Sequence, residues 1–185
     1  MEKTNIKKQQ VAPFFEVHEC LETGYQSMYA TRDLSPFSVL SKFGYHGVFN
    51  EPTKFTVQVS ENQHIQLKPT YLQYINHSCH PNVFFDTRAM MLSTVRPILC
   101  GEEVTFFYPS TEWKMTEPFD CLCRNDNCLG RIQGAAYLGH DNLSNYRLSD
   151  YIIHKYGRLP EIQHQRFTQF KLLRTLDVYD EAIVT

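Results

Sequence analysis

Three cysteines in one short segment constrain this chain more than any other feature. In "CLCRNDNCLG", Cys121, Cys123 and Cys128 follow the spacing C-x-C-x4-C. Cysteines only two residues apart, such as Cys121 and Cys123, are poorly placed to form a disulfide with each other. A loop can instead turn all three thiolates toward one ion, and Zn²⁺ favours tetrahedral sulfur ligands. The spacing therefore predicts a zinc-binding loop rather than three unrelated structural thiols.

Three sulfur ligands leave one corner of a zinc tetrahedron open. The candidates for that corner are Cys20, Cys79, Cys100 and a nearby histidine. Cys79 belongs to "YINHSCHPN", residues 74–82, which places an Asn, two His and a Cys close together beside apolar residues. Such polar and reactive side chains are unusual in an ordinary core strand. If Cys79 completes the site, four sulfur ligands make the zinc structural and leave no open position for chemistry.

Length and composition indicate one domain with a small appendage. The 185 residues are 42% hydrophobic and 14% aromatic, which is enough for a core. The net charge of −2 and a pI of about 6.4 give no basic field for direct nucleic-acid binding. No run approaches the ~20 apolar residues of a membrane helix, and the N-terminus lacks the apolar run of a secretion signal. We expect a soluble intracellular protein of the cytoplasm or nucleus, where cysteines more often bind metal than form disulfides.

Hydrophobic periodicity predicts many short strands over residues 11–110. Alternation in "FTVQV" places Phe55, Val57 and Val59 on one face of a strand. Turn residues such as Glu61-Asn62 separate this strand from the next. No convincing helical period precedes residue 110, so we expect a body made mainly of β-strands.

The C-terminal part follows a helical period instead. In residues 143–157, the apolar side chains recur at helical spacing as far as Gly157, a typical C-terminal stop. Pro160 can begin a second helix. The chain therefore divides into four parts: a flexible N-terminal tail over residues 1–12, a β-rich body over 13–117, a zinc-binding segment over 118–134, and a C-terminal helical extension over 135–185.

Three segments taken together resemble the SET-domain lysine methyltransferases. "NHSCHPN", "GEEVTFFY" and "CLCRNDNC" are similar, in that order, to the family's N-H-S-C-x-P-N, G-E-E-L-T-F-D-Y and post-SET C-x-C-x4-C motifs. Upstream, "TGYQSMYATRDL" looks like the opening motif, and the resemblance covers roughly residues 14–132. It implies a mainly β fold, the SET-domain β-clip with a pseudoknot, in which the N-H-S-C segment threads beneath the loop of the second motif. A zinc-binding post-SET loop and C-terminal helices would complete the fold.

The resemblance also implies a function and a set of site residues. The activity would be methyl transfer from S-adenosylmethionine to the ε-amine of a lysine in a histone or other protein, beside a structural zinc ion. Tyr108 matches the closing tyrosine of the second motif, which lines the transfer site, and Phe106 matches the position that influences how many methyl groups are added. The cofactor would be held by Gly24, Tyr25, Gln26, Tyr74, Asn76 and His77. The zinc ligands would be Cys79, Cys121, Cys123 and Cys128.

The chemistry of methyl transfer explains why aromatic residues are needed there. The reaction is an in-line displacement by a neutral amine, whereas lysine in water has a pKa near ~10.4. Desolvation in an apolar channel and the adjacent sulfonium charge both lower that pKa. Phe106, Phe107 and Tyr108 could line such a channel, and the Tyr108 hydroxyl could align the amine. Alignment and proximity would then supply most of the rate.

Some residues depart from the family pattern. Gln73 replaces an Arg, Phe107 replaces the Asp before the closing tyrosine, and Gln26 replaces the second glycine of the opening G-x-G. Asn76 and Tyr108 are retained. The alternative function is therefore a catalytically inactive, zinc-stabilised SET-fold module that binds a partner. A third, a zinc-thiol redox sensor, would need an exposed cysteine of low pKa outside the cluster, and the sequence indicates none.

Overall fold

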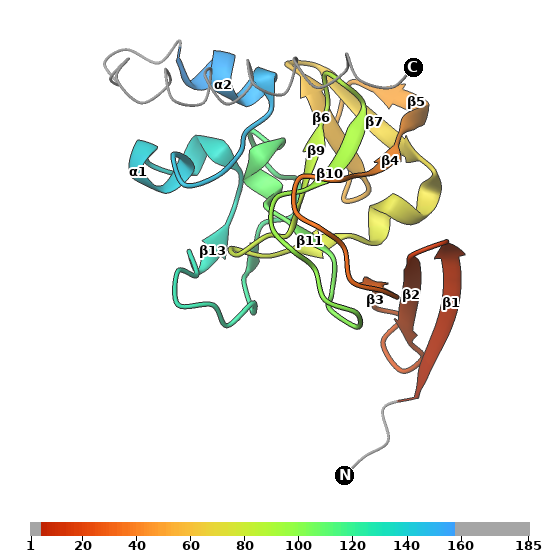
Figure 1. Ribbon diagram of the computed structural model, residues 1–185. Coiled ribbons are helices and arrows are strands. Elements are labelled where there is room, and N and C mark those ends of the chain that lie inside the picture. Colours follow the sequence, from red (N-terminus) through yellow and green to blue (C-terminus); the bar gives the residue numbers. More distant parts are fainter. Residues whose placement is uncertain (1–4, 158–185) are drawn as a thin grey trace, which may run out of the picture.

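The computed structural model describes residues 5–157 of the chain. Short β-strands dominate this range, and its helices are few and short (Figure 1). The mainly β architecture expected from the sequence is confirmed. The helix expected to begin at Pro160 lies outside the described residues.

The first three strands form an antiparallel sheet in the order β1-β2-β3. Their bounds are β1 Ile6–Ala12, β2 Phe15–Cys20 and β3 Gln26–Ala30. The flexible tail expected over residues 1–12 is wrong for residues 6–12, because these form β1. The side chains of β1 are largely exposed, so no hydrophobic alternation marks the strand. Backbone pairing with β2 holds it instead, and Lys7 lies opposite Glu19 with a nitrogen–oxygen distance of 3.8 Å.

A second sheet of five strands, in the order β4-β10-β9-β11-β8, forms the centre of the molecule. The bounds are β4 Val39–Lys42, β8 Asn76–His77, β9 Val83–Asp86, β10 Met91–Thr94 and β11 Thr105–Phe106. Strand β11 lies between β8 and β9 and is parallel to both. The connection between β8 and β9, residues 78–82, therefore crosses β11. This crossing has the pseudoknot arrangement that the resemblance implies.

Asn82 fixes this crossing from inside the protein. Its side chain is fully buried. Its Nδ2 donates hydrogen bonds to the Glu103 carbonyl oxygen at 2.8 Å and to Glu102 Oε1 at 3.2 Å. Its Oδ1 accepts the Thr105 backbone N–H at 2.8 Å. One amide thus binds the "NHSCHPN" segment to the "GEEVTFFY" segment.

A third sheet has the strand order β5-β7-β6, and a short 3₁₀ helix follows it. The bounds are β5 Gly44–Phe49, β6 Thr56–Ser60, β7 Gln63–Lys68 and η1 Thr70–Tyr74. Val57 is buried, as the alternation predicts, and Val59 packs against the core. The prediction is wrong for Phe55, which precedes β6 and is 42% exposed. Its ring lies instead under the Lys54 amine, 4.9 Å from the ring centroid.

The C-terminal part of the described chain forms short helices and a small two-stranded sheet. The bounds are η2 Tyr108–Ser110, β12 Phe119–Asp120, β13 Arg131–Ile132, η3 Ala135–Tyr137, α1 His140–Leu143 and α2 Asp150–Tyr156. Helix α2 confirms, over residues 150–156, the helical period read over residues 143–157, with Gly157 at its C-terminal cap. Helices α1 and α2 lie at the opposite end of the molecule from the β1–β2 hairpin (Figure 1).

Two groups of buried side chains hold these elements together. The larger joins the three main sheets and includes Phe15, Ile65 and Phe85. The smaller packs the C-terminal helices against Phe107 and includes Tyr146 and Ile152. Phe107 lies between Phe106, which belongs to the larger group, and Tyr108, which packs against it. The two groups therefore meet at the segment that the sequence marks as the transfer site.

Candidate active site and cysteine cluster

A cleft of about 980 Å³ brings together segments that are far apart in the sequence. Its walls come from the β2–β3 turn, the region around β6, the end of η1 with β8, β11, and the loop that leads into the cysteine segment. All the residues predicted to bind the cofactor or to line the transfer site contribute to it: Gly24, Tyr25, Gln26, Tyr74, Asn76, His77, Phe106 and Tyr108. The fold thus gathers them into one site, and their individual roles stay predictions.

Tyr108 lies in this cleft among other aromatic rings. Its ring centroid is 4.7 Å from that of Phe106 and 6.0 Å from that of Phe119. The hydroxyl donates a hydrogen bond to the Ile75 carbonyl oxygen at 3.4 Å. Burial raises the pKa of this hydroxyl well above its usual range, and the nearby acidic groups raise it further. The Tyr108 hydroxyl is therefore protonated at neutral pH and can donate or accept a hydrogen bond.

His77 connects the cleft with the cysteines. Its Nδ1 accepts the backbone N–H of Tyr108 at 3.2 Å, and its Nε2 lies 3.4 Å from the Cys79 sulfur. A ring that accepts at Nδ1 carries its proton at Nε2, so it can donate toward that sulfur. Burial lowers the pKa of His77 to about 4, so the ring is neutral at physiological pH. The side chain thereby positions both Tyr108 and Cys79.

Asn76 lines the cleft and is held by two hydrogen bonds. Its Nδ2 donates to the Gln26 carbonyl oxygen at 3.1 Å and to Glu103 Oε1 at 3.0 Å. Both amide protons are thereby used, and among the described residues Oδ1 has no hydrogen-bond partner. Gly24 adopts a φ of +69°, a conformation that favours glycine. The retained glycine of the opening motif therefore occupies the position in this turn where a side chain would be strained.

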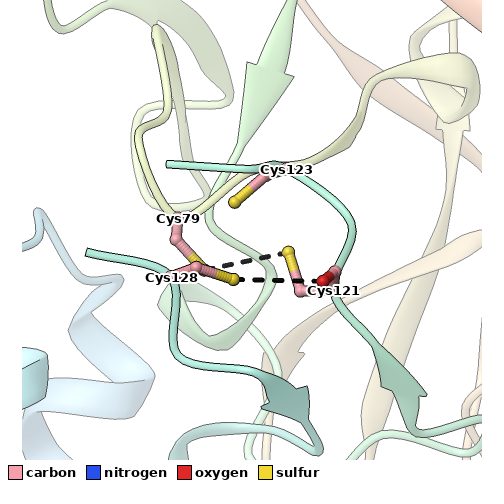
Figure 2. Close-up of side chains that lie close together, drawn as sticks. All are labelled: Cys79, Cys121, Cys123 and Cys128. Carbon is pink, nitrogen blue, oxygen red and sulfur yellow. Dashed lines mark hydrogen bonds between the residues drawn. The ribbon is translucent and has the colours of Figure 1, made fainter. Parts of the chain in front are cut away.

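The four predicted zinc ligands converge at one point. The sulfur atoms of Cys79, Cys121, Cys123 and Cys128 all lie within 4.8 Å of one another (Figure 2). Strands β12 and β13 pair on either side of the loop that carries the last three. Cys79 approaches from the β8–β9 connection, and its sulfur is 3.9 Å from that of Cys121. Sequence reasoning left the fourth ligand open, and the fold brings Cys79, rather than Cys20 or Cys100, to the other three.

The donor set and its spacing fit a tetrahedral zinc ion. With Zn–S bonds of about 2.3 Å, the sulfur atoms of a tetrahedron are about 3.8 Å apart, close to the Cys79–Cys121 distance. Burial raises the pKa of Cys121 to about 11. Against burial, hydrogen bonds with Asn125 lower the pKa of Cys123 to about 6. A divalent cation would favour the thiolate form of all four, so the cluster could hold zinc and would then cross-link the loop to the β8–β9 connection.

The cleft carries an excess of negative charge. Among its described lining residues, Lys54 is the single lysine or arginine, whereas four are acidic: Glu103, Glu112, Glu117 and Asp120. Low-dielectric walls strengthen such a field, which favours cationic ligands. Sequence reasoning gave no role to the acidic residues of the cleft. Glu103 could have been noticed within "GEEVTFFY", but Glu112 belongs to a segment that reads only as a connecting loop.

Comparison with known proteins identifies the family. The sequence profile of the SET domain family matches residues 3–109, which is more than half of the chain. The chain therefore belongs to the SET domain family. The match begins before residue 13, where the sequence patterns placed the start of the domain, and it includes strand β1.

Individual relatives are methyltransferases by name. The chain is 43% identical over 102 residues to the methyltransferase flvH of Aspergillus flavus, covering 54% of this chain and 57% of that protein. It is 36% identical over 73 residues to an H3 lysine-36 specific histone-lysine N-methyltransferase of Gibberella zeae, which is 36% of this chain and 8% of that protein. A protein of the same name from Saccharomyces cerevisiae is 29% identical over 90 residues, 45% of this chain and 12% of that protein. The chain spans little more than half of the first relative and a small part of the others.

None of the helices within residues 5–157 has the length and apolar character needed to cross a bilayer.

Proposed function

We propose that this chain is an S-adenosylmethionine-dependent methyltransferase that acts on the ε-amine of a protein lysine. One observation carries the proposal: eight residues from three separate segments, each matched to a family motif, line a single cleft around Tyr108. Two relatives that are histone-lysine methyltransferases by name support lysine as the acceptor. The name of the Aspergillus flavus relative specifies methyl transfer without an acceptor.

The residues of the cleft suit a cationic donor and acceptor. S-adenosylmethionine, when bound, supplies an electrophilic methyl group on a positively charged sulfur. Asn76 would offer its free Oδ1 to the ammonium group of the cofactor, while Glu103 holds the amide in place. The excess of acidic side chains attracts both the cofactor and the protonated lysine. Phe106 and Phe119 would shield the amine from water, and the protonated Tyr108 hydroxyl would orient it for in-line attack.

The cysteine cluster would support this site without joining the reaction. Four sulfur ligands leave a zinc ion no open position. Its effect would instead be structural, because the loop from residue 121 to 128 follows directly on the cleft residues Phe119 and Asp120. Cys121 and Cys123 also line the cleft. Zinc binding would therefore fix one wall of the cofactor site.

Transfer of a radiolabelled methyl group tests the proposal. The zinc-loaded protein is incubated with labelled S-adenosylmethionine and either histones or a host lysate, beside Tyr108→Phe and the control Tyr137→Phe. Tyr137 is 57% exposed, so its hydroxyl can be removed without disturbing the cleft. Labelled bands that fade with Tyr108→Phe alone are expected. No label above background with folded, zinc-loaded protein would contradict transfer to these acceptors.

The second candidate function is an inactive module that binds a partner. Gln26 and Phe107 favour it, because both replace family residues. Gln26, however, continues into regular strand β3, and the turn retains glycine at Gly24, where φ is positive. Phe107 is buried against Tyr146 rather than left without a partner. Thermal stability with and without S-adenosylmethionine separates the two functions, because a bound ligand raises the stability of the native state.

A further inference from the structure

Glu112 is a buried carboxyl group within the cleft that the mechanism above does not use. It follows Tyr108 by four residues, and its backbone N–H donates to the Tyr108 carbonyl oxygen at 3.0 Å. The residue is 8% exposed and lines the cleft together with Phe106 and Tyr108. Burying an ionisable carboxyl without a cationic partner is costly. Its position therefore needs an explanation.

The two oxygens of this carboxyl group differ in their contacts. Oε1 accepts the backbone N–H of Gln58 at 2.8 Å and the Thr111 hydroxyl at 3.2 Å. Within residues 5–157, Oε2 has no hydrogen-bond partner and Glu112 takes part in no ion pair. One oxygen is therefore fixed to the scaffold, while the other is available to a group that enters the cleft.

The charged surroundings suit an incoming cation. Burial raises the pKa of Glu112 to about 7, against the hydrogen bonds from Gln58 and Thr111, which lower it. The negative charges of Glu103 and Glu112 both act on the Tyr108 hydroxyl. Helix α2 contributes Lys155, which lies over the Trp113 ring and is paired with Glu61. Other titratable residues also line the cleft: Tyr25, Lys54, Tyr74, His77, Glu117, Asp120, Cys121 and Cys123. The Tyr151 hydroxyl accepts a hydrogen bond from Gln58 Nε2.

From this arrangement we infer that Glu112 receives the proton of the substrate ammonium group before methyl transfer, an inference that rests on the proposed function. The proton passes from the R–NH₃⁺ group to the Glu112 carboxylate, which gives R–NH₂ and a neutral carboxylic acid. The amine lone pair then forms the N–CH₃ bond while the S–CH₃ bond of the sulfonium breaks, and its electron pair returns to sulfur. Glu112 later releases the proton to water. A carboxyl group that titrates near neutral pH is suited to this exchange.

A purely structural role is the competing explanation. Gln58 Oε1 accepts the Trp113 backbone N–H at 2.9 Å, and the Gln58 backbone N–H donates to Glu112 Oε1. These two hydrogen bonds hold Gln58 and the segment at Glu112 together. Glu112→Gln separates the two roles, because the amide keeps an oxygen for the Gln58 N–H and loses only the ionisable group. A structural defect would lower activity equally at every pH. The effect of losing a proton acceptor would disappear at high pH, where the substrate ammonium group loses its proton to the solvent without help.

The first test measures kcat/KM from pH 6 to pH 10, with recombinant histone H3 and with Nα-acetyl-lysine methylamide as acceptors. Glu112→Gln is expected to lose about 100-fold at pH 7 and to come within about 3-fold of the wild type at pH 10. In the wild type, kcat/KM is expected to rise with pH as the Glu112 carboxyl group loses its proton. This rise should be absent from the pH profile of Glu112→Gln. An equal loss across the whole range would overturn the inference.

The second test needs no transfer, so the inference and the proposed function can fail separately. The wild-type holoprotein labelled with ¹³C at its Glu carboxyl carbons is titrated by NMR, and Glu112→Gln assigns the signal. Nα-acetyl-lysine methylamide is expected to lower the pKa of Glu112 by about 1, whereas the uncharged norleucine analogue leaves it unchanged. A pKa that the amine does not move would overturn the inference even if methyl transfer occurs. A shifted pKa without transfer to any acceptor would retain the contact between Glu112 and an ammonium group and contradict the proposed function.

Discussion

The rings of Phe107 and Tyr146 stack face to face, with centroids 3.6 Å apart and planes inclined by 7°. Phe107 occupies the position where the family motif has an aspartate, and Tyr146 belongs to the segment between α1 and α2. The Tyr146 hydroxyl donates to the Cys79 carbonyl oxygen at 2.9 Å. This one pair of residues therefore links the Tyr108 segment, the cysteine cluster and the C-terminal helices. The apolar replacement at Phe107 is explained by this packing.

Removing the Tyr146 ring should destabilise the fold far more than removing its hydroxyl. Tyr146→Ala is expected to lower the free energy of unfolding by about 3–5 kcal/mol, since a buried aromatic ring is lost. Tyr146→Phe keeps the stack and loses one hydrogen bond, at a cost of about 1 kcal/mol. Urea denaturation measures both, with exposed Tyr137→Phe as the control. Equal costs for the two Tyr146 variants would contradict the role assigned to the stack.

Metal content should depend on Cys79 but not on Cys100. Cys79→Ser removes one of the four converging sulfurs, whereas Cys100 is exposed and lies outside the cluster. Mass spectrometry under native conditions is expected to find one zinc ion in the wild type and in Cys100→Ser. Cys79→Ser should lose zinc and unfold at a lower temperature, because metal binding contributes to folding free energy. Full zinc occupancy in Cys79→Ser would contradict the assignment of this ligand.

The contribution of Glu112 to the stability of the protein should fall between pH 4.5 and pH 7. The carboxyl pKa is about 7 in the folded protein and near 4.5 when unperturbed. In that window the folded state binds a proton that the unfolded state has released, so raising the pH favours unfolding. The contribution is on the order of 3 kcal/mol, present in full below pH 4.5 and lost above pH 7. His77, whose pKa is lowered to about 4, gives an opposite pH dependence in both proteins, so the comparison of the two isolates Glu112. Urea denaturation at several pH values should show that the free energy of unfolding of the wild type falls relative to that of Glu112→Gln across this window, and a constant difference would contradict the raised pKa.

Phe106 should influence how many methyl groups are added, if the proposed transfer occurs. Its ring is buried, with its centroid 4.8 Å from that of Phe85 and 4.7 Å from that of Tyr108. Phe106→Tyr introduces a hydroxyl that can hold a water molecule where a second methyl group would lie. Mass spectrometry of the product is expected to show a shift toward monomethylation, with Phe37→Tyr, 80% exposed, as the control. An unchanged product distribution would contradict this role.

The local sequence predicted the mainly β fold, helix α2 and three cysteines of the cluster. These depend on periodicity and spacing within a few residues, which the chain carries wherever it folds. The resemblance to a family supplied Cys79 and the residues of the cleft. Strand β1 could not be predicted in this way, because its exposed side chains carry no alternation and its pairing is made through the backbone.

Tertiary structure decided the features that join distant segments. The buried amide of Asn82 hydrogen-bonds Glu102, 20 residues further along the chain. Phe107 stacks on Tyr146, which follows the cysteine loop in the sequence. Glu112 lines the cleft although its segment has no hydrophobic periodicity. Each depends on which side chains long-range packing brings into contact, since desolvation and hydrogen bonding act between neighbours in space rather than in sequence. The residue types determined what chemistry was available, and the fold determined which of them share one cleft.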